Sequence, residues 1–250
     1  MGNKGRDERI LTMKILAVDT SSQVAAVAVL DGNKLLGEYL INHKMEHSKK
    51  LMPMIIELMK TLELKPGDID VYAASTGPGS FTGLRIGVTT VKAMAYAAQK
   101  PVIGIPALDG LAFNIPVCAS LVCPIMDARN GQVYTAIYKK EMDRQVKLTE
   151  YMGIHISDLI PLIKGRNHNT VFVGDAVYMH RDYLKKELRE ACEFAPPHLV
   201  HQRASSIAQI ALERASAGEL EDCFGMVPFY LRKSQAEREH EGKRMEQMKS

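Results

Sequence analysis

A glycine-rich turn constrains this chain more than any other feature. Residues 77–87 read Gly-Pro-Gly-Ser-Phe-Thr-Gly-Leu-Arg-Ile-Gly, between a strand-like run at 71–76 and a run of small and apolar residues that ends near Gln99. A strand that turns through glycines into a helix points unpaired backbone N–H groups into one space. Such a turn either cradles an anion or lets a second backbone pack very close. It is not a Walker loop, because no Gly-Lys-Ser/Thr ends it, and its spacing is not that of a dinucleotide-binding turn.

Composition indicates an ordinary soluble protein. The chain has 250 residues, of which 46% are hydrophobic and 24% are charged, and its net charge is +3. That balance, with no basic stripe, does not indicate nucleic-acid binding by the chain alone, and no apolar run is long enough to cross a membrane. Residues 1–12 are polar, so we interpret them as a disordered extension or an expression remnant, and 234–250 as a charged tail. Without a secretory signal pattern, we expect a cytoplasmic protein.

The first half predicts one α/β lobe over residues 13–114. Strand patterns at 14–19, 24–30 and 34–40 are joined by turns, including the hairpin signal Asp31-Gly32. A helix is predicted at 47–62, and strands at 71–76 and 101–105 enclose the glycine turn and its helix. A meander followed by helix–strand–helix–strand is typical of a mixed sheet.

The second half repeats this order and predicts a second lobe over residues 115–233. The strand at 121–127 ends in Asp127 as the first strand ends in Asp19, and the chain returns through 132–138. A helix at 157–163, a strand at 170–174 and a helix at 178–191 follow. A last helix at 204–217, capped by Ser205 or Ser206, can pack back on the first lobe. We therefore predict two duplicated α/β lobes with mixed sheets.

The acids that end the two first strands are candidates for phosphate chemistry. An Asp followed by small hydroxyl residues, here Thr20 and Ser21 after Asp19, is a common way to hold a magnesium–phosphate group. Gly77 and Gly79 would supply backbone N–H groups from the glycine turn, where Thr82 could cap the helix. The alternative is that Asp19 only caps its turn by accepting from the N–H of Ser21 or Ser22.

Two neighbouring helices are more apolar than one core contact requires. Apolar residues of the helix at 47–62 cover an arc of roughly 200°, and the helix after Gly83 is apolar or small nearly all round. This pattern favours a helical interface with another subunit, and the alternative is burial between lobes of the same chain. The residues that we assign to the interface are Leu51, Met54, Ile55, Leu58, Gly83, Leu84, Gly87, Val88, Val91 and Ala95.

Four segments together resemble the TsaB (YeaZ) family over about residues 13–238. They are Ile15 to Ser21, His47-Ser48 before the apolar helix, the glycine turn 77–87, and Pro228-Phe229-Tyr230-Leu231-Arg232 with Gln235-Ala236-Glu237. The resemblance implies an actin-like, Hsp70-type (ribonuclease H-like) fold of two duplicated lobes. It also implies a partner subunit in bacterial synthesis of the threonylcarbamoyl group on the adenosine beside the tRNA anticodon. Such a subunit pairs with the catalytic TsaD, works alongside the ATPase TsaE, and forms a homodimer when alone.

Two departures from the catalytic relatives in this resemblance favour a non-catalytic subunit. In Pro106-Ala107-Leu108-Asp109-Gly110-Leu111, alanine and leucine stand where those relatives carry a His-x-x-x-His metal pair. The chain has no Gly-Gly pair for adenosine, and Asp175 follows Gly174 where phosphates would lie.

We therefore expect no metal or cofactor in this subunit, with ATP and metal on partner subunits and tRNA bound only within the complex. The residues that we assign to a vestigial nucleotide site are Asp19, Thr20, Ser21, Gly77, Gly79, Asp127 and Gly174. The alternative is an ATP-dependent, kinase-like enzyme of the same fold in which Asp19 and Asp127 hold magnesium.

Overall fold

Two sheets with equivalent strand orders form the framework of the computed structural model, which describes residues 12–43, 47–116, 120–141 and 144–232. The orders are β3-β2-β1-β4-β5 in the first sheet and β10-β7-β6-β11-β12 in the second. In each sheet the central strand pairs antiparallel with the strand that follows it and parallel with a later one. The predicted repeat is therefore confirmed. The predicted tail at 234–250 and all of the predicted extension except Thr12 lie outside the described residues.

The first sheet follows the predicted pattern closely. Its strands are β1 (Lys14–Asp19), β2 (Ala25–Asp31), β3 (Lys34–Ile41), β4 (Val71–Gly77) and β5 (Val102–Pro106). Its helices are α2 (His47–Thr61), α3 (Phe81–Ala98) and α4 (Ala107–Phe113), with a 3-10 turn at Pro66–Asp68. Gly32 adopts a φ of 52° in the hairpin between β2 and β3, a conformation that glycine permits at low cost. Within the described part of the chain, no helix is both long and apolar enough to cross a membrane.

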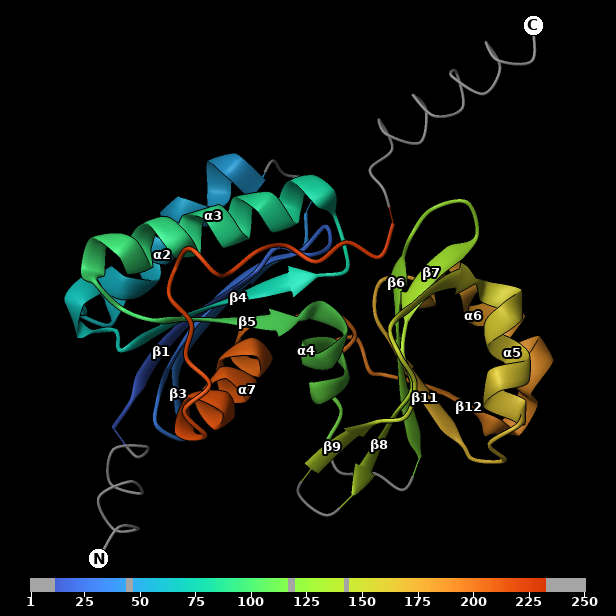
Figure 1. Cartoon of the computed structure of the whole chain (residues 1–250). Coiled ribbons are helices and arrows are strands. Elements are labelled where there is room, and N and C mark those ends of the chain that lie inside the picture. Colours follow the sequence, from blue (N-terminus) through green and yellow to red (C-terminus); the bar gives the residue numbers. More distant parts are fainter. Residues whose placement is uncertain (1–11, 44–46, 117–119, 142–143, 233–250) are drawn as a thin grey trace, which may run out of the picture.

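Alternation along β1 explains why helices cover both faces of the first sheet. Successive side chains of a strand point to opposite faces. Leu16 and Val18 pack in the core formed with α2 and α3, whereas Ile15 and Ala17 pack in the core formed with α7 (Ala204–Ser216). Figure 1 shows α2 and α3 together on one side of this sheet and α7 on the other. The last helix thus completes the first lobe although it follows the second lobe in sequence.

The second sheet departs from the predicted pattern in its middle. Its strands are β6 (Leu121–Asp127), β7 (Gln132–Thr135), β8 (Tyr138–Glu141), β9 (Arg144–Lys147), β10 (Met152–His155), β11 (Thr170–Val173) and β12 (Cys192–Phe194). Its helices are α5 (Ile156–Lys164) and α6 (Val177–Leu188), with a 3-10 turn at Arg189–Ala191. The single strand predicted at 132–138 is two strands, because the chain changes its pairing along β6: Thr135 pairs with Ile125 and Tyr138 pairs with Val122.

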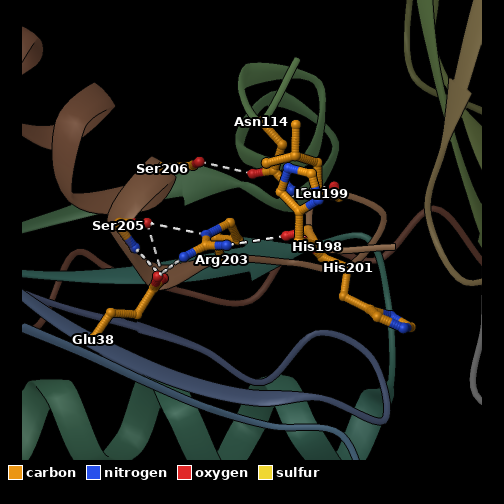
Figure 2. A network of polar contacts seen from close by, with 8 residues as sticks. All are labelled: Glu38, Asn114, His198, Leu199, His201, Arg203, Ser205 and Ser206. Carbon is orange, nitrogen blue, oxygen red and sulfur yellow. Dashed lines mark hydrogen bonds and ion pairs between the residues drawn. The ribbon is translucent and has the colours of Figure 1, made fainter. Parts of the chain in front are cut away.

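Asn114 holds together the two chain segments that connect the lobes. It follows α4 and is buried, and its Nδ2 donates to the carbonyls of Leu199 (2.9 Å) and His201 (2.6 Å), which precede α7. The hydroxyl of Ser206 donates to Asn114 Oδ1 at 2.7 Å, so the amide is satisfied on both sides. Figure 2 shows these contacts converging from α4, the connecting segment and α7.

Glu38 of β3 anchors the start of α7 beside this junction (Figure 2). Its carboxylate pairs with the Arg203 guanidinium and accepts from both the N–H and the hydroxyl of Ser205, each at 2.9 Å. The predicted cap of α7 is therefore wrong. Arg203 occupies the N-cap position without a side-chain cap bond, because Ser205 bonds to Glu38 and Ser206 bonds to Asn114.

Candidate functional site

The glycine turn packs directly on the end of β1. A Cβ on Gly79 or Gly83 would lie 2.1 Å from the carbonyl oxygen of Ser21 or Thr20, respectively. A Cβ on Gly87 would lie 2.3 Å from Thr20 Oγ1. These distances leave no room for a side chain, so here the glycines serve close packing of two backbones. The N-cap of α3 is Ser80, whose hydroxyl accepts from Gly83 N at 3.2 Å, and not Thr82.

Asp19 turns inward and caps its own turn. Its Oδ1 accepts from the N–H of Ser21 at 2.8 Å and from the Ser21 hydroxyl at 2.6 Å. Burial raises the pKa of Asp19 from 3.8 to about 6, and the two bonds from Ser21 oppose that rise. Thr20 is also engaged, since its hydroxyl donates to Gly83 O at 2.7 Å. Asp19, Thr20 and Ser21 are therefore buried structural residues at the contact between the end of β1 and the glycine turn.

Asp127 and Gly174 lie together at the equivalent place in the second lobe. Gly174 has a φ of 117°, and a Cβ there would lie 2.1 Å from Ile125 O, so only glycine fits. The next residue, Asp175, accepts from the backbone N–H of Asp127 at 3.0 Å. Burial raises the pKa of Asp175, and the nearby charge of Asp127 raises it further. Two carboxyl groups thus lie side by side at this end of the second sheet.

A pocket of about 240 Å³ between the lobes brings the two strand ends together. It is lined by Ser22, Gln23, Val24, Asn42, Asp127, Asp175, Tyr178, Met179 and His201. Of the seven residues predicted for a nucleotide site, Asp127 is the one among these lining residues. Asp19, Thr20, Ser21 and Gly79 instead pack where the glycine turn meets the end of β1, Gly174 packs against Ile125 O, and Gly77 packs against Phe229 O. A pocket edged by the carboxyl groups of Asp127 and Asp175 disfavours phosphate and suits hydrogen-bond donors or a cationic group.

The pocket also contains residues that the sequence analysis missed. Asn42 Nδ2 donates to His201 Nε2 at 2.9 Å, and the Tyr178 ring lies 5.6 Å from the His201 ring. Burial lowers the pKa of His201 and so favours the neutral form of its ring. These residues follow β3, begin α6 and precede α7, so no local spacing could have grouped them.

The segment compared with the metal pair of the catalytic relatives forms α4. Ala107 and Leu111 are buried in apolar surroundings and have no atom that can ligate a metal. Asp109, on the same helix, accepts from the hydroxyls of Tyr138 at 2.7 Å and Tyr151 at 2.8 Å. Among the described residues, no group of three or more His, Cys, Asp or Glu side chains is placed to hold a metal ion.

The structure corrects the residues assigned to a partner interface. All ten are buried within the chain: Leu51, Met54, Ile55, Leu58, Gly83, Leu84, Gly87, Val88, Val91 and Ala95. They lie on the inner faces of α2 and α3, because a helix on a sheet buries its most apolar side. The outer faces carry other apolar side chains, namely Met52, Ile56 and Tyr96, which are 43%, 57% and 66% exposed.

Comparisons with known proteins find relatives over most of the chain. Residues 34–240 match the family model described as TsaD, tRNA N6-adenosine threonylcarbamoyltransferase. The tRNA threonylcarbamoyladenosine biosynthesis protein TsaB of Bacillus subtilis is 31% identical over 225 residues, which cover 90% of this chain and 96% of that protein.

Two solved structures show the likeness of the fold. YeaZ from Pseudomonas aeruginosa superposes with a TM-score of 0.73 at 23% identity, over 88% of this chain and 100% of that one. Component A of the (R)-2-hydroxyglutaryl-CoA dehydratase of Acidaminococcus fermentans reaches 0.51 at 12% identity, over 82% and 100%. Together with the duplicated strand order, these likenesses show an actin-like α/β fold of two lobes. The near full-length match to a protein named TsaB places the chain in the TsaB (YeaZ) family of tRNA threonylcarbamoyladenosine biosynthesis proteins.

Proposed function

We propose that this chain is a non-catalytic subunit that binds a TsaD-type catalytic subunit during threonylcarbamoyl transfer to the adenosine beside the tRNA anticodon. In this proposal a TsaE-type ATPase works with the pair, and ATP and metal are held by the partner subunits. The tRNA is bound within the complex, the isolated chain is a homodimer, and the complex acts in the cytoplasm.

The outward surface of α2 and α3 is the observation that supports this proposal best. The inner faces of both helices are already used by the core, yet Met52 and Ile56 on α2 and Tyr96 on α3 remain exposed. On α3 they are accompanied by small exposed residues, Thr89 and Ala93, which let another helix approach closely. Exposed apolar residues on two neighbouring helices offer a surface for a protein–protein contact.

Binding to the catalytic subunit tests the proposed interface. The variant Ile56→Glu/Tyr96→Glu places two charges on the outer faces, and we expect the dissociation constant from a TsaD-type subunit to rise at least about tenfold. The matched control is Leu35→Glu, which charges a 46% exposed apolar residue on β3, away from these helices. Sedimentation of the isolated variant tests whether the homodimer uses the same surface. An affinity equal to that of the wild type in a folded variant would place the interface elsewhere.

The non-catalytic role is tested by omission and by nucleotide binding. A tRNA modification assay with each subunit left out in turn should lose activity without this chain, while the chain alone should give none.

Titration calorimetry addresses the kinase-like alternative. Where the glycine turn meets the end of β1, Asp19 Oδ1 already accepts two hydrogen bonds from Ser21. The carbonyl groups of Thr20 and Ser21 fill the space beside the glycines of the turn. We therefore expect no micromolar binding of Mg-ATP, and such binding would favour the alternative.

A further inference from the structure

The chain that follows α7 runs back across the first lobe. Glu221 forms a two-bond bridge with Val102 at the edge of β5, with distances of 2.8 and 3.0 Å. Met226 is then buried in the core beneath α3, and its carbonyl accepts from the Lys92 ammonium at 2.8 Å. This segment is therefore an ordered part of the first lobe. Figure 1 shows it in red, passing along α3 toward the second lobe.

Residues 229 and 230 fix the segment on the glycine turn and the start of α3. The Phe229 N–H donates to Thr76 O at 2.7 Å, and a Cβ on Gly77 would lie 2.4 Å from Phe229 O. The ring of Tyr230 stacks on Phe81 with 4.5 Å between centroids. Gly77 thus packs under this segment, and so it is not free to cradle an anion.

The same segment contacts the second lobe through the side chains of Phe229 and Arg232. The Phe229 ring lies 5.8 Å from the Tyr151 ring, just before β10. Arg232 Nη1 donates to Ala128 O at 2.9 Å, in the turn between β6 and β7 and next to Asp127 of the pocket. Its side chain also lies over Gly153 of β10, at 3.5 Å from the position of a Cβ.

We propose that Met226–Arg232 is a strap that holds the two lobes in one fixed relative orientation. The lobes also meet at the Asn114 junction and at α4, whose Asp109 accepts from Tyr138 and Tyr151 of the second lobe. The strap adds a tie at the β6–β7 turn, away from those contacts, so that rotation about them is opposed by Arg232 and Phe229. In Figure 1 the strap ends beside β6 and β7, at the opposite end of the lobe boundary from the β8–β9 hairpin. The strap therefore keeps the pocket at constant width and fixes α3 relative to the second lobe.

Hydrogen exchange on the full-length chain tests the strap. The variant Phe229→Ala/Arg232→Ala removes both contacts with the second lobe and leaves the backbone bond to Thr76 in place. The matched control, Phe224→Ala/Arg166→Ala, removes the same residue types where each contact stays within one lobe. Phe224 packs on Tyr96 of the first lobe, and Arg166 donates to Leu162 O of the second. Exchange is followed at residues 22–24 and 127–131, and the radius of gyration is measured by small-angle scattering.

The strap predicts at least about fivefold faster exchange in both segments and a larger radius of gyration for Phe229→Ala/Arg232→Ala, because local opening becomes easier. The control should stay within about twofold of the wild type. Equal exchange in the strap variant and the wild type, or an equal increase in the control, would overturn the proposal. If circular dichroism shows that the double variant is unfolded, the single variant Arg232→Ala is judged by the same direction, with a change of about threefold.

Discussion

The carboxylate of Asp19 is buried where the fold favours its protonated form. Its pKa in the folded chain is about 6, above the ordinary value of 3.8, because burial outweighs the bonds from Ser21. A group whose pKa is raised on folding contributes most to stability below its unfolded pKa. That contribution is lost as the pH rises through the folded pKa. The first lobe should therefore be more stable near pH 4 than near pH 7 as far as this group is concerned.

The variant Asp19→Asn isolates this effect. Asparagine keeps an oxygen that accepts from the Ser21 N–H but does not ionise, so the loss of stability with rising pH should be smaller. Between about pH 4.5 and 7.5 the wild type should lose about 2 kcal/mol more than the variant, as expected for a pKa raised by about two. Urea unfolding at both pH values measures the difference. The same pH dependence in both proteins would contradict the assignment.

Gly83 should tolerate no side chain, because its Cβ position meets a backbone atom. The carbonyl oxygen of Thr20 lies 2.1 Å away, and moving it requires moving β1. We expect Gly83→Ala to lower the free energy of unfolding by about 2–3 kcal/mol, the usual cost of overpacking. Gly67→Ala is the control, since no atom lies within 4 Å of the Cβ position there. Chemical denaturation compares the stabilities of the two variants. Equal stabilities would show that the backbone at Thr20 can move to accommodate a side chain at residue 83.

At the scale of elements, α2 shows which part of the sequence pattern was ambiguous. Its apolar residues cover a wide arc, and the structure divides that arc into a face on the sheet with Leu58 and a face toward solvent with Ile56. Periodicity measures how wide an apolar face is, but the position of the sheet decides which part of it is covered. The interface prediction failed in its residues for this reason.

Substitutions on the two faces of α2 should differ sharply. Leu58 is 1% exposed, and Leu58→Ala should lower the free energy of unfolding by about 2–5 kcal/mol through loss of buried surface and formation of a cavity. Ile56 is 57% exposed, and Ile56→Ala should change it by less than about 0.5 kcal/mol. Thermal and urea unfolding of the isolated chain give both values. A large effect at Ile56 would mean that the isolated chain already buries this face.

Most of the elements could be predicted from the sequence, and most of the site could not. Strands such as β1 and β4 and the hairpin at Gly32 follow from local patterns, and the repeat follows from their order. The use of the glycine turn depends on the carbonyls of Thr20 and Ser21, which follow β1, more than 50 positions earlier in the chain. The pocket likewise joins Asn42 with His201, which are 159 positions apart. Contacts of that kind are set by topology and leave no trace in local spacing.

For the whole molecule, Asn114 joins both connections between the lobes through one buried amide. Replacing it by leucine leaves the carbonyls of Leu199 and His201 and the hydroxyl of Ser206 without their partner. We expect Asn114→Leu to lower the free energy of unfolding by about 2–4 kcal/mol, since buried polar groups lose their bonds. The control Asn169→Leu changes an exposed side chain. Denaturant unfolding followed by circular dichroism measures the free energy of unfolding of both variants. Equal decreases would show that the hydrogen bonds of Asn114 contribute no more to stability than an exposed side chain does.

The position of α7 has a consequence for how the protein is made. The first sheet needs Ile207 and Ala211 to cover one of its faces, and these residues emerge from the ribosome only after the whole second sheet. Residues 121–194 of the second lobe, in contrast, are continuous in sequence. The nascent chain should therefore complete its second lobe first, while the earlier-synthesised half waits with an uncovered apolar face that chaperones can recognise.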